Sequence, residues 1–295
     1  MKKHKLGGVG AAMITPFKSD LSCDFDTLGR MIDYVIDGGT DYIVSLGTTA
    51  ETPTLSHEER NEVFRYIRER VAGRTPIVLG AGGNDTVRLI EQIQAMDLEG
   101  VDALLSVTPY YNKPSQEGLY RHFKAVAEAS PRPIILYNVP GRTGCSLSVS
   151  AVERLSKHPN IIGIKEASGN ISYAMSISRF LSDDFVMYSG NDDMIVPILS
   201  IGGSGVISVF ANTNPKECHD LVAKWFEGDQ AGSLAIQQKY LDYIHALFCE
   251  VNPIPVKEAM NLMGMQVGGY RLPLYEMAEK NREHLRDEMK KAGIL

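Results

Sequence analysis

The chain has 295 residues, 44% of them apolar, with a formal net charge of -6 and a pI near 5.7. A chain of this length can bury one large core, and its acidic balance leaves no basic stripe with which nucleic acid would be bound. No stretch approaches the ~20 apolar residues that cross a bilayer, and the start MKKHKLGG lacks the apolar core of a signal peptide, so we expect a cytoplasmic protein without nucleic-acid or membrane partners.

Short β-rich apolar runs alternate with stretches of helical pattern. Between the runs, stretches such as 56–73 and 115–130 place apolar residues every three or four positions, as in a helix with one buried face. Ser56 and Glu59 form a capping-box pattern, which marks a helix start. The strand candidates are VGAAMITPF (9–17), YIVSLGT (42–48), PIVLGAG (76–82), DALLSVTP (102–109), PIILYNV (133–139), IIGIKEA (161–167), FVMYSG (185–190) and GVISVF (205–210).

These strand candidates are apolar at nearly every position, which is typical of a parallel sheet covered by crossover helices. Eight such units predict an α/β fold of the (β/α)8 TIM-barrel class. An open doubly wound sheet is the alternative, but MITPFKSD (13–20) stands where its dinucleotide fingerprint would be expected. After residue 212 the pattern is helical, so we expect a barrel over 1–225 and a C-terminal helical segment over 226–295 packed on it.

Cysteine and histidine spacing gives no sign of a cross-linked or metal-bound fold. The chain has four cysteines without a C-x-x-C pair, and its seven histidines show no ligand spacing. We therefore expect reduced thiols and no metal site.

Lys165 ends the run IIGIK, where a strand buried on both faces would ordinarily carry another aliphatic residue. The carboxyl ends of barrel strands carry the active site in this fold class. Burial disfavours the ammonium form and leaves an amine that can attack a carbonyl, which is how Schiff-base lysines are prepared. A lysine that points into solvent or pairs with Glu166 fits the strand pattern about equally well.

Tyr137 ends the preceding strand candidate, and neighbouring strands of a parallel barrel lie about 5 Å apart. Its phenol is therefore expected to reach Lys165 and relay protons to a carbonyl or imine, although a tyrosine at a barrel rim is also common. Arg142, in the turn G-R-T-G, suits bidentate capture of a carboxylate, while an isolated loop arginine is more often solvated.

Two further loops carry candidate groups at the same end of the predicted barrel. Thr48 and Thr49 follow the second strand and offer hydroxyls and backbone N–H groups to a small carboxylate, or else form an ordinary helix-capping turn. TPYYNKP (108–114) presents paired tyrosines, which are as typical of subunit interfaces as of active sites.

Five segments carry a distinctive pattern: GTTAE (47–51), TPYYNKPSQEGLY (108–120), LYNVPGRTG (136–144), GIKEASGN (163–170) and NPIPVKEAM (252–260). Together they resemble the dihydrodipicolinate synthase family of pyruvate-dependent class I aldolases. The likeness extends from about residue 6 to the last helix, and YNVPGRTG with KEASGN at this spacing is highly specific for the superfamily. The Thr-Thr pair and Arg142 point to the synthase branch.

The resemblance implies a lyase that joins pyruvate to L-aspartate 4-semialdehyde in the diaminopimelate route to lysine. Lys165 would form an imine with pyruvate, so that no separate cofactor is needed. Thr48, Tyr111 and Tyr137 would relay protons, with Tyr111 reaching in from a neighbouring subunit of a homotetramer built as a dimer of dimers. The binding roles fall on Thr48 and Thr49 for the pyruvate carboxylate, Arg142 for the carboxylate of the semialdehyde, and Gly190 and Ile207 for the pocket lining.

The sequence departs from the family pattern in two places. Ala50 stands where the family usually has glycine, which affects a close backbone approach or a positive φ, although we expect no loss of activity. The lysine-binding regulatory pocket of some members falls on five residues of which Arg60 and Arg88 differ: His57, Arg60, Asn84, Arg88 and Tyr110. Because Arg88 puts a positive charge where the ammonium of the ligand would sit, we expect weak or absent inhibition by L-lysine.

Two other functions remain open at this point. A sister aldolase, such as N-acetylneuraminate lyase or a 2-keto-3-deoxy sugar acid aldolase, would share the lysine and tyrosine but bind a polyol, for which Arg142 is a poor partner. A non-catalytic barrel that senses a keto acid would be expected to lack part of the threonine, tyrosine and lysine set. All of that set is present here.

Overall fold

A computed structural model describes residues 5–295, and the segment MKKH at the start of the chain lies outside the described residues. Its strands are parallel neighbours in sequence order and close into a barrel. This confirms the (β/α)8 prediction and excludes the open sheet. The strands are β1 (Gly8–Ala12), β2 (Tyr42–Ser45), β3 (Ile77–Gly80), β4 (Ala103–Val107), β5 (Ile134–Asn138), β6 (Ile161–Glu166), β7 (Val186–Ser189) and β8 (Gly205–Ser208).

Helices follow the strands along the chain. Two predicted helix starts are confirmed, because Ser56 and Glu59 form a complete capping box and Ser115 caps the helix that follows it. The α-helices are α1 (Phe25–Asp37), α2 (His57–Val71), α3 (Thr86–Ala95), α4 (Gln116–Ala129), α5 (Pro140–Thr143), α6 (Val149–Leu155), α7 (Ile171–Ser178), α8 (Ile195–Ser200), α9 (Pro215–Glu227), α10 (Gln230–Ala246), α11 (Ile254–Leu262) and α12 (Glu279–Ala292). Short 3-10 turns are η1 (Thr48–Ala50), η2 (Thr52–Thr54), η3 (Asp192–Met194) and η4 (Phe210–Asn212).

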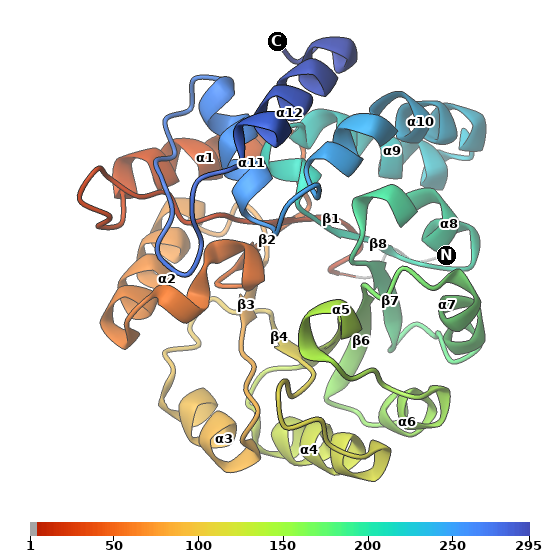
Figure 1. Ribbon diagram of the computed structural model, residues 1–295. Helices are drawn as coiled ribbons and strands as arrows, with labels where there is room; N and C mark the ends of the chain where they lie inside the picture. Colours follow the sequence, from red (N-terminus) through yellow and green to blue (C-terminus); the bar gives the residue numbers. More distant parts are fainter. Residues whose placement is uncertain (1–4) are drawn as a thin grey trace. The chain divides into compact units, whose positions relative to one another are not determined.

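One of two compact units combines residues 5–7 with Pro76–Ile207. Its strands β4 to β7 are buried at nearly every position, as the apolar runs predict. In Figure 1 the helices α3, α4, α6, α7 and α8 lie outside the strands of this unit. The ladders from β3 to β8, with one register shift between Ile134 and Ile135, set which residues stand side by side at the carboxyl ends of these strands.

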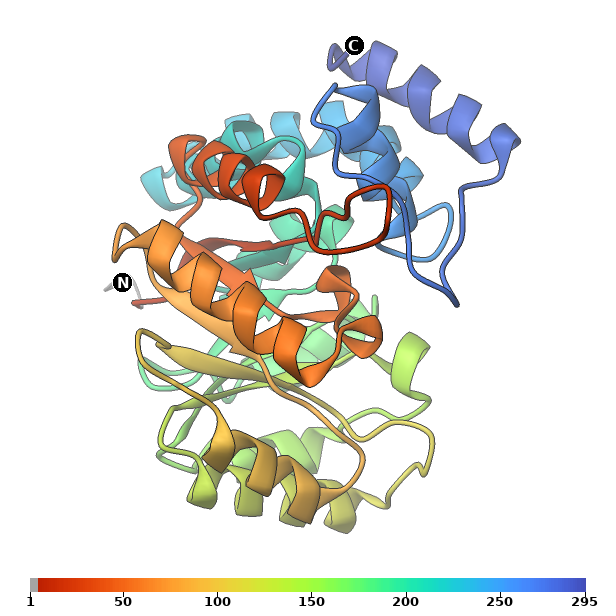
Figure 2. The same ribbon diagram turned by 90° about the vertical axis from the view of Figure 1, so that its left-hand side faces the viewer.

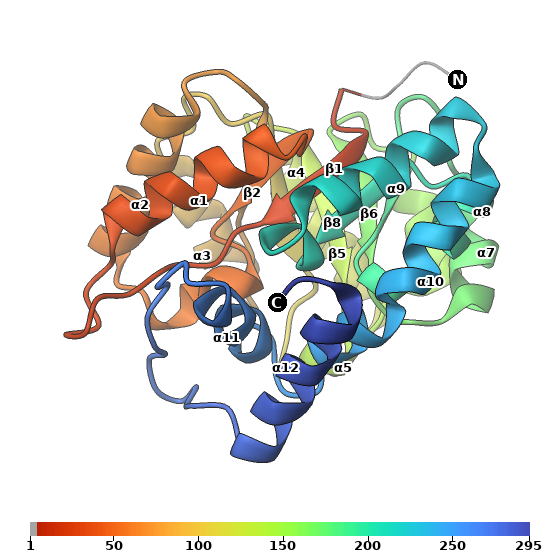
Figure 3. The same cartoon turned by 90° about the horizontal axis from the view of Figure 1, so that it is seen from above.

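The second unit combines Gly8–Thr75 with Ser208–Leu295. Strands β1 and β2 pair in parallel, and a Cβ on Gly10 would lie 2.1 Å from the ring of Tyr42, so only glycine fits there. Helices α1 and α2 pack side by side, red and orange in Figure 2. Helices α9, α10 and α12 form a packed series at the carboxyl-terminal end, as Figure 3 shows. The expected division of the chain at residue 225 stays a prediction.

Two other expectations concern the chain as a whole. Across residues 5–295 the cysteines are all free thiols, as their spacing predicts. None of the helices described there is both long and apolar enough to cross a membrane.

Candidate active site

Lys165 and Tyr137 stand side by side on neighbouring strands. The ladder between β5 and β6 pairs Tyr137 directly with Lys165, and both side chains are buried, at 7% and 6% exposure. The Lys165 ammonium nitrogen lies 4.4 Å from the centre of the Tyr137 ring. The predicted proximity of the two residues is therefore confirmed, and both side chains are buried in one place.

The orientation of Glu166 decides between the alternatives left open for Lys165. The Glu166 carboxylate accepts hydrogen bonds from Asn138 Nδ2 at 2.7 Å and from the Ser168 backbone N–H at 2.7 Å. Lys165 is 6% exposed, and its nitrogen lies against the ring of Tyr137. The burial of Lys165 excludes a solvated lysine, and the Glu166 carboxylate is bound to Asn138 and Ser168 and not to Lys165.

Asn138 and Glu166 connect the two strands that carry this pair, a role that the sequence reasoning missed. They are paired in the ladder one position after Tyr137 and Lys165. Asn138 Oδ1 also accepts from the Leu147 backbone N–H at 3.0 Å, so its side chain joins β6 to the segment beyond α5. Burial raises the pKa of Glu166, while the hydrogen bonds from Ser168 and Asn138 oppose that rise. The signal in the sequence that could have indicated this role is that each of these two apolar strands ends on a polar residue.

Gly190 and Ile207 lie on the strands that follow. Gly190 comes directly after β7, and a Cβ there would lie 2.5 Å from the Cβ of Ala167 and 3.1 Å from Cε of Lys165. The glycine therefore leaves the space that the stem of Lys165 occupies. Ile207 lies in β8 and is 1% exposed.

Arg142 lies in α5, a single helical turn after β5 that ends at Gly144 in the left-handed conformation. Hydrogen bonds of a buried side chain fix this turn: the Thr143 hydroxyl accepts from Thr108 Oγ1 at 3.1 Å and donates to the Cys145 carbonyl at 2.9 Å. The Arg142 side chain is exposed. Arg142 therefore stands on a turn whose base is fixed by hydrogen bonds.

The loop after β4 carries Tyr110 and Tyr111. Tyr111 is 89% exposed and has a φ of 71°, which is uncommon for a residue with a side chain. Tyr110 is 43% exposed, and its carbonyl accepts from Asn84 Nδ2 at 3.2 Å. Two of the regulatory candidates are therefore in contact. Arg88, in the first turn of α3, is exposed and lies 3.8 Å from Asp85.

Thr48 and Thr49 belong to the second unit, where they form the turn η1 directly after β2 and Gly47. Thr49 is 4% exposed, and its hydroxyl accepts from Asn252 Nδ2 at 2.9 Å. Ala50 has 3-10 helical geometry, and the left-handed position is the next residue, Glu51, with φ 55°. The departure from glycine at residue 50 therefore falls where no positive φ is needed.

The remaining regulatory candidates lie in the first turn of α2. His57 is exposed there, and Arg60 Nε donates to the Leu55 carbonyl at 3.1 Å. The arginine is thus held against the backbone that precedes its own helix.

Comparison with known proteins identifies the family of the chain. The model of the Dihydrodipicolinate synthetase family matches residues 5–292. The chain belongs to this family. Relatives from Acetivibrio thermocellus and Caldicellulosiruptor saccharolyticus are 48% and 50% identical, over 100% and 97% of both chains respectively, and each is named 4-hydroxy-tetrahydrodipicolinate synthase.

Solved structures of the dihydrodipicolinate synthetase family agree in fold. A dihydrodipicolinate synthase from Thermotoga maritima gives a TM-score of 0.96 at 40% identity and covers 99% of this chain and 100% of its own. A second from Acinetobacter baumannii, solved in complex with pyruvate, gives 0.95 at 43% identity and covers 98% and 100%. The chain is accordingly an aldolase-type lyase, and these names favour the synthase branch over the sister aldolases.

Proposed function

We propose that the chain acts as a 4-hydroxy-tetrahydrodipicolinate synthase, which joins pyruvate to L-aspartate 4-semialdehyde through an imine on Lys165. The observation that carries the proposal is the burial of Lys165, whose nitrogen lies 4.4 Å from the centre of the Tyr137 ring. An amine held out of water beside a phenol supplies the nucleophile and the proton relay that imine formation needs. The names of the relatives support the same reaction.

In the proposed reaction the Lys165 amine attacks the keto carbon of pyruvate, and the keto oxygen leaves as water to give an imine. Loss of a methyl proton forms an enamine, whose carbon then attacks the aldehyde carbon of the semialdehyde. The amino group of the bound product displaces Lys165 by transimination as the ring closes. When the proton leaves, the electron pair of its C–H bond forms the C=C bond of the enamine, and the π electrons of the imine move to the Lys165 nitrogen. The imine itself thus takes up the electrons, and we propose neither a cofactor nor a metal.

The other residues of the proposed site bind the substrates and move protons. The exposed guanidinium of Arg142 supports a contact with the carboxylate of the semialdehyde, because a carboxylate can pair with it in bidentate fashion. The space left by Gly190 supports a pocket beside Lys165. The proposed assignments are a proton relay of Thr48, Tyr111 and Tyr137, a pyruvate carboxylate site at Thr48 and Thr49, and a pocket lining of Gly190 and Ile207.

Tyr111 supports the proposal that the sites are completed between subunits. A tyrosine that is 89% exposed and held at a φ of 71° is poorly placed to act within its own chain, but it can enter the site of a neighbour. We therefore propose a homotetramer, built as a dimer of dimers. One solved relative, 39% identical with a TM-score of 0.95, is described as a monomeric dihydrodipicolinate synthase variant, so the subunit number needs its own measurement.

Mixing inactive variants tests the shared site. Lys165→Ala and Tyr111→Phe each lack one essential group, but a mixed pair of subunits contains one site with both groups intact. If the two variants exchange subunits at random, about a quarter of the sites should recover. No recovery despite proven subunit exchange would contradict the role of Tyr111 in a neighbouring site.

The substrate assignment is tested by condensation of pyruvate with aspartate semialdehyde, coupled to a downstream reductase, with N-acetylmannosamine as the comparison aldehyde donor. Turnover with the semialdehyde alone supports the synthase, and turnover with the sugar alone would move the chain to the sister branch. Borohydride trapping of pyruvate should disappear in Lys165→Ala while the circular dichroism spectrum stays unchanged. Trapping that persists on the same peptide would show that another residue is the nucleophile.

Two further points belong to this proposal. A cytoplasmic location is expected for an enzyme of amino-acid biosynthesis, and cell fractionation would check it. The candidates for the regulatory pocket remain His57, Asn84 and Tyr110. We expect this pocket to bind L-lysine weakly or not at all.

A further inference from the structure

A buried ion pair lies behind the turn that carries Thr48 and Thr49. Lys257, on α11, and Glu51, directly after η1, are both fully buried, with 2.8 Å between Nζ and Oε1. Both residues belong to the second unit. Replacing a buried ion pair by apolar residues is often neutral for stability. The stability of the fold therefore does not by itself explain why an ion pair is found here.

The ammonium group of Lys257 has an acceptor for each of its three protons. Besides Glu51, it donates to the Thr15 carbonyl at 3.1 Å and to the Gly269 carbonyl. The ring of Phe17 lies 4.3 Å from Nζ, measured to its centre. Burial lowers the pKa of Lys257, and the charge of Glu51 opposes that effect. The nitrogen is therefore fixed in position from several sides.

Glu51 in turn sets where the turn ends. Its backbone is left-handed, with φ 55° and ψ 31°, a conformation that is unfavourable for a residue with a Cβ. Its N–H donates to the Thr48 carbonyl at 3.2 Å and closes η1, and the same residue precedes η2. Because the carboxylate is tied to Lys257, the side chain holds the backbone in this conformation.

Other contacts fix the same turn from neighbouring segments. Thr15 Oγ1 donates to the Ala50 carbonyl at 2.7 Å, so Thr15 contacts both the turn and the ammonium of Lys257. Asn252 Nδ2 donates to Thr49 Oγ1 at 2.9 Å. A hydroxyl that already accepts a hydrogen bond keeps its own proton for donation, which suits it to bind an anion.

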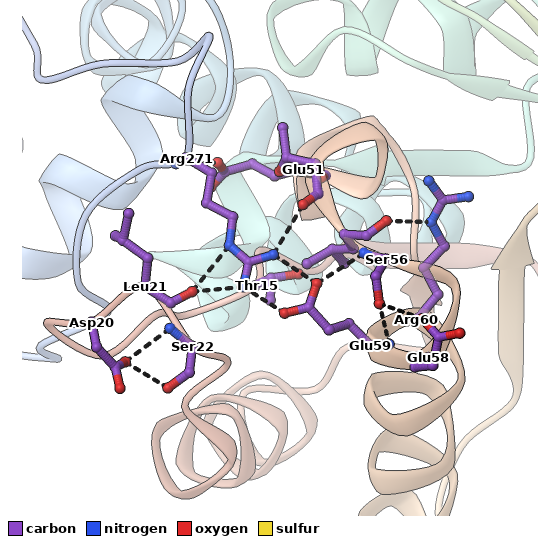
Figure 4. A network of polar contacts seen from close by, with 12 residues as sticks. Thr15, Asp20, Leu21, Ser22, Glu51, Ser56, Glu58, Glu59, Arg60 and Arg271 are labelled. Carbon is purple, nitrogen blue, oxygen red and sulfur yellow. Dashed lines mark hydrogen bonds and ion pairs between the residues drawn. The ribbon is translucent and has the colours of Figure 1, made fainter.

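Arg271 adds an outer layer. In Figure 4 its guanidinium lies between the Leu21 carbonyl and the Glu59 carboxylate, with which it makes two contacts of 2.6 and 2.7 Å. It also donates to the Thr54 carbonyl at 2.9 Å, at the end of η2. Its backbone N–H donates to Glu51 Oε2 at 3.4 Å. The segment from Asn252 to Arg271 therefore makes hydrogen bonds to several positions of the stretch that follows β2.

We propose that Lys257 is a positioning residue, which holds the Thr48–Thr49 turn through Glu51 in the geometry that receives the carboxylate of pyruvate. The inference rests on the proposed function, because it assumes that this turn binds pyruvate. It assigns Lys257 no contact with the substrate. Its loss should weaken the binding of pyruvate and leave the binding of aspartate semialdehyde unchanged.

The test removes both charges together, because Lys257→Met alone would leave the Glu51 carboxylate buried without its partner. In the double variant Glu51→Gln/Lys257→Met, borohydride trapping is measured against pyruvate concentration, and KM is measured for each substrate. We expect half-saturation by pyruvate to rise about tenfold, the effect of about 1.4 kcal/mol. The final extent of trapping on Lys165 and the KM for aspartate semialdehyde should stay within about twofold of the wild type.

Glu258→Gln/Arg282→Met is the matched control. It removes an ion pair of 2.8 Å whose acid is the next residue of α11, and no contact of that pair with the turn is found within residues 5–295. This control should bind pyruvate as the wild type does. A double variant at Glu51 and Lys257 that folds and binds pyruvate normally would overturn the inference, as would an equal loss in the control.

Glu51→Asp keeps both charges and serves if the double variant does not fold. The shorter side chain must draw the end of the turn toward Lys257 or give up the contact, so half-saturation by pyruvate should rise here too. Unchanged pyruvate binding in Glu51→Asp would also overturn the inference. If the wild-type chain traps no pyruvate on Lys165, the proposed function fails first and this inference fails with it.

Discussion

Asn138→Asp should destabilise the protein in a way that depends on pH. Asn138 Nδ2 donates to Glu166 Oε2 at 2.7 Å, while its Oδ1 accepts from the Leu147 N–H at 3.0 Å and from Ser146 Oγ at 3.2 Å. Because Ser146 Oγ and the Leu147 N–H both donate to Oδ1, the side chain of the variant keeps its orientation. The oxygen that replaces Nδ2 therefore faces Glu166. The substitution therefore sets two buried carboxyl oxygens against each other.

The size of the effect follows from the two interactions that change. Loss of a hydrogen bond to a charged group costs about 1.5–3 kcal/mol. Two charges about 3 Å apart repel by about 5 kcal/mol at an effective dielectric constant of 20. The carboxyl pair escapes most of this repulsion by sharing a proton. We expect the free energy of unfolding to fall by about 3 kcal/mol at pH 8 and by less at lower pH.

The sign of the pH dependence is fixed by proton linkage. Burial already raises the pKa of Glu166, and a second carboxylate beside it raises that pKa further. Above the pKa of the unfolded chain, near 4, the folded variant therefore keeps a proton that the unfolded chain has lost. Its stability should decrease as the pH rises, by up to about 1.4 kcal/mol per pH unit, until the folded pair ionises.

Urea unfolding at pH 5, 6.5 and 8 measures this slope, and the swapped variant Asn138→Asp/Glu166→Gln provides the control. In the swap, the new Gln amide can donate to the new Asp carboxylate, while its oxygen still accepts from Ser168. Stability should return to near the wild-type value and the added slope should vanish. A single variant with a loss that does not change with pH, or a swap that recovers nothing, would refute the reasoning.

Three other predictions follow from separate sites. Gly190→Ala places a methyl 2.5 Å from the Cβ of Ala167 and 3.1 Å from Cε of Lys165, so both residues must shift and pyruvate trapping should slow about tenfold. Gly83→Ala, with its nearest neighbour at 3.8 Å, should not change the trapping rate. Burial lowers the pKa of His122 to about 4, so the unfolded chain binds a proton first as the pH falls. Up to about 3 kcal/mol of stability should be lost between pH 6.5 and 4, and His122→Gln should flatten that part of the urea-derived curve. L-Lysine should inhibit weakly or not at all because of Arg88, and a micromolar to low-millimolar inhibition midpoint would contradict this.

The sequence predicted the strands in number and order because strands buried on both faces carry aliphatic residues at nearly every position. The predicted runs were too long at their carboxyl ends: VGAAMITPF extends to residue 17, whereas β1 ends at Ala12. Apolar and small residues continue there into loops that are also buried. An apolar composition indicates which residues are buried, whereas a strand ends where its hydrogen-bond ladder ends. The sequence could therefore not fix the carboxyl ends of the strands.

The pairing of Tyr137 with Lys165 could be predicted because both stand near the ends of successive strands. One alternative for Lys165 could also have been rejected from the sequence. Successive residues of a strand point to opposite faces, so Lys165 and its neighbour Glu166 cannot pair while both remain in β6. The partner of Glu166 follows from the same alignment one position further on, where Asn138 stands opposite it, although only the structure shows the hydrogen bond between them.

Lys165 and Lys257 are both buried lysines, yet only the first was conspicuous in the sequence. A parallel barrel strand has no solvent-facing side, so a charge within it is an anomaly that demands an explanation. A helix usually has a solvent face on which a lysine every turn is ordinary, so Lys257 in PIPVKEAM looks like a surface residue. Its partner Glu51 lies 206 residues away in the sequence, and nothing local marks it as buried. A charged residue at a strand end, such as Lys165, can therefore be found in the sequence because it interrupts an apolar strand pattern. A charged residue on a helix that positions a distant loop, such as Lys257, is recognised only when the fold brings the helix and the loop together.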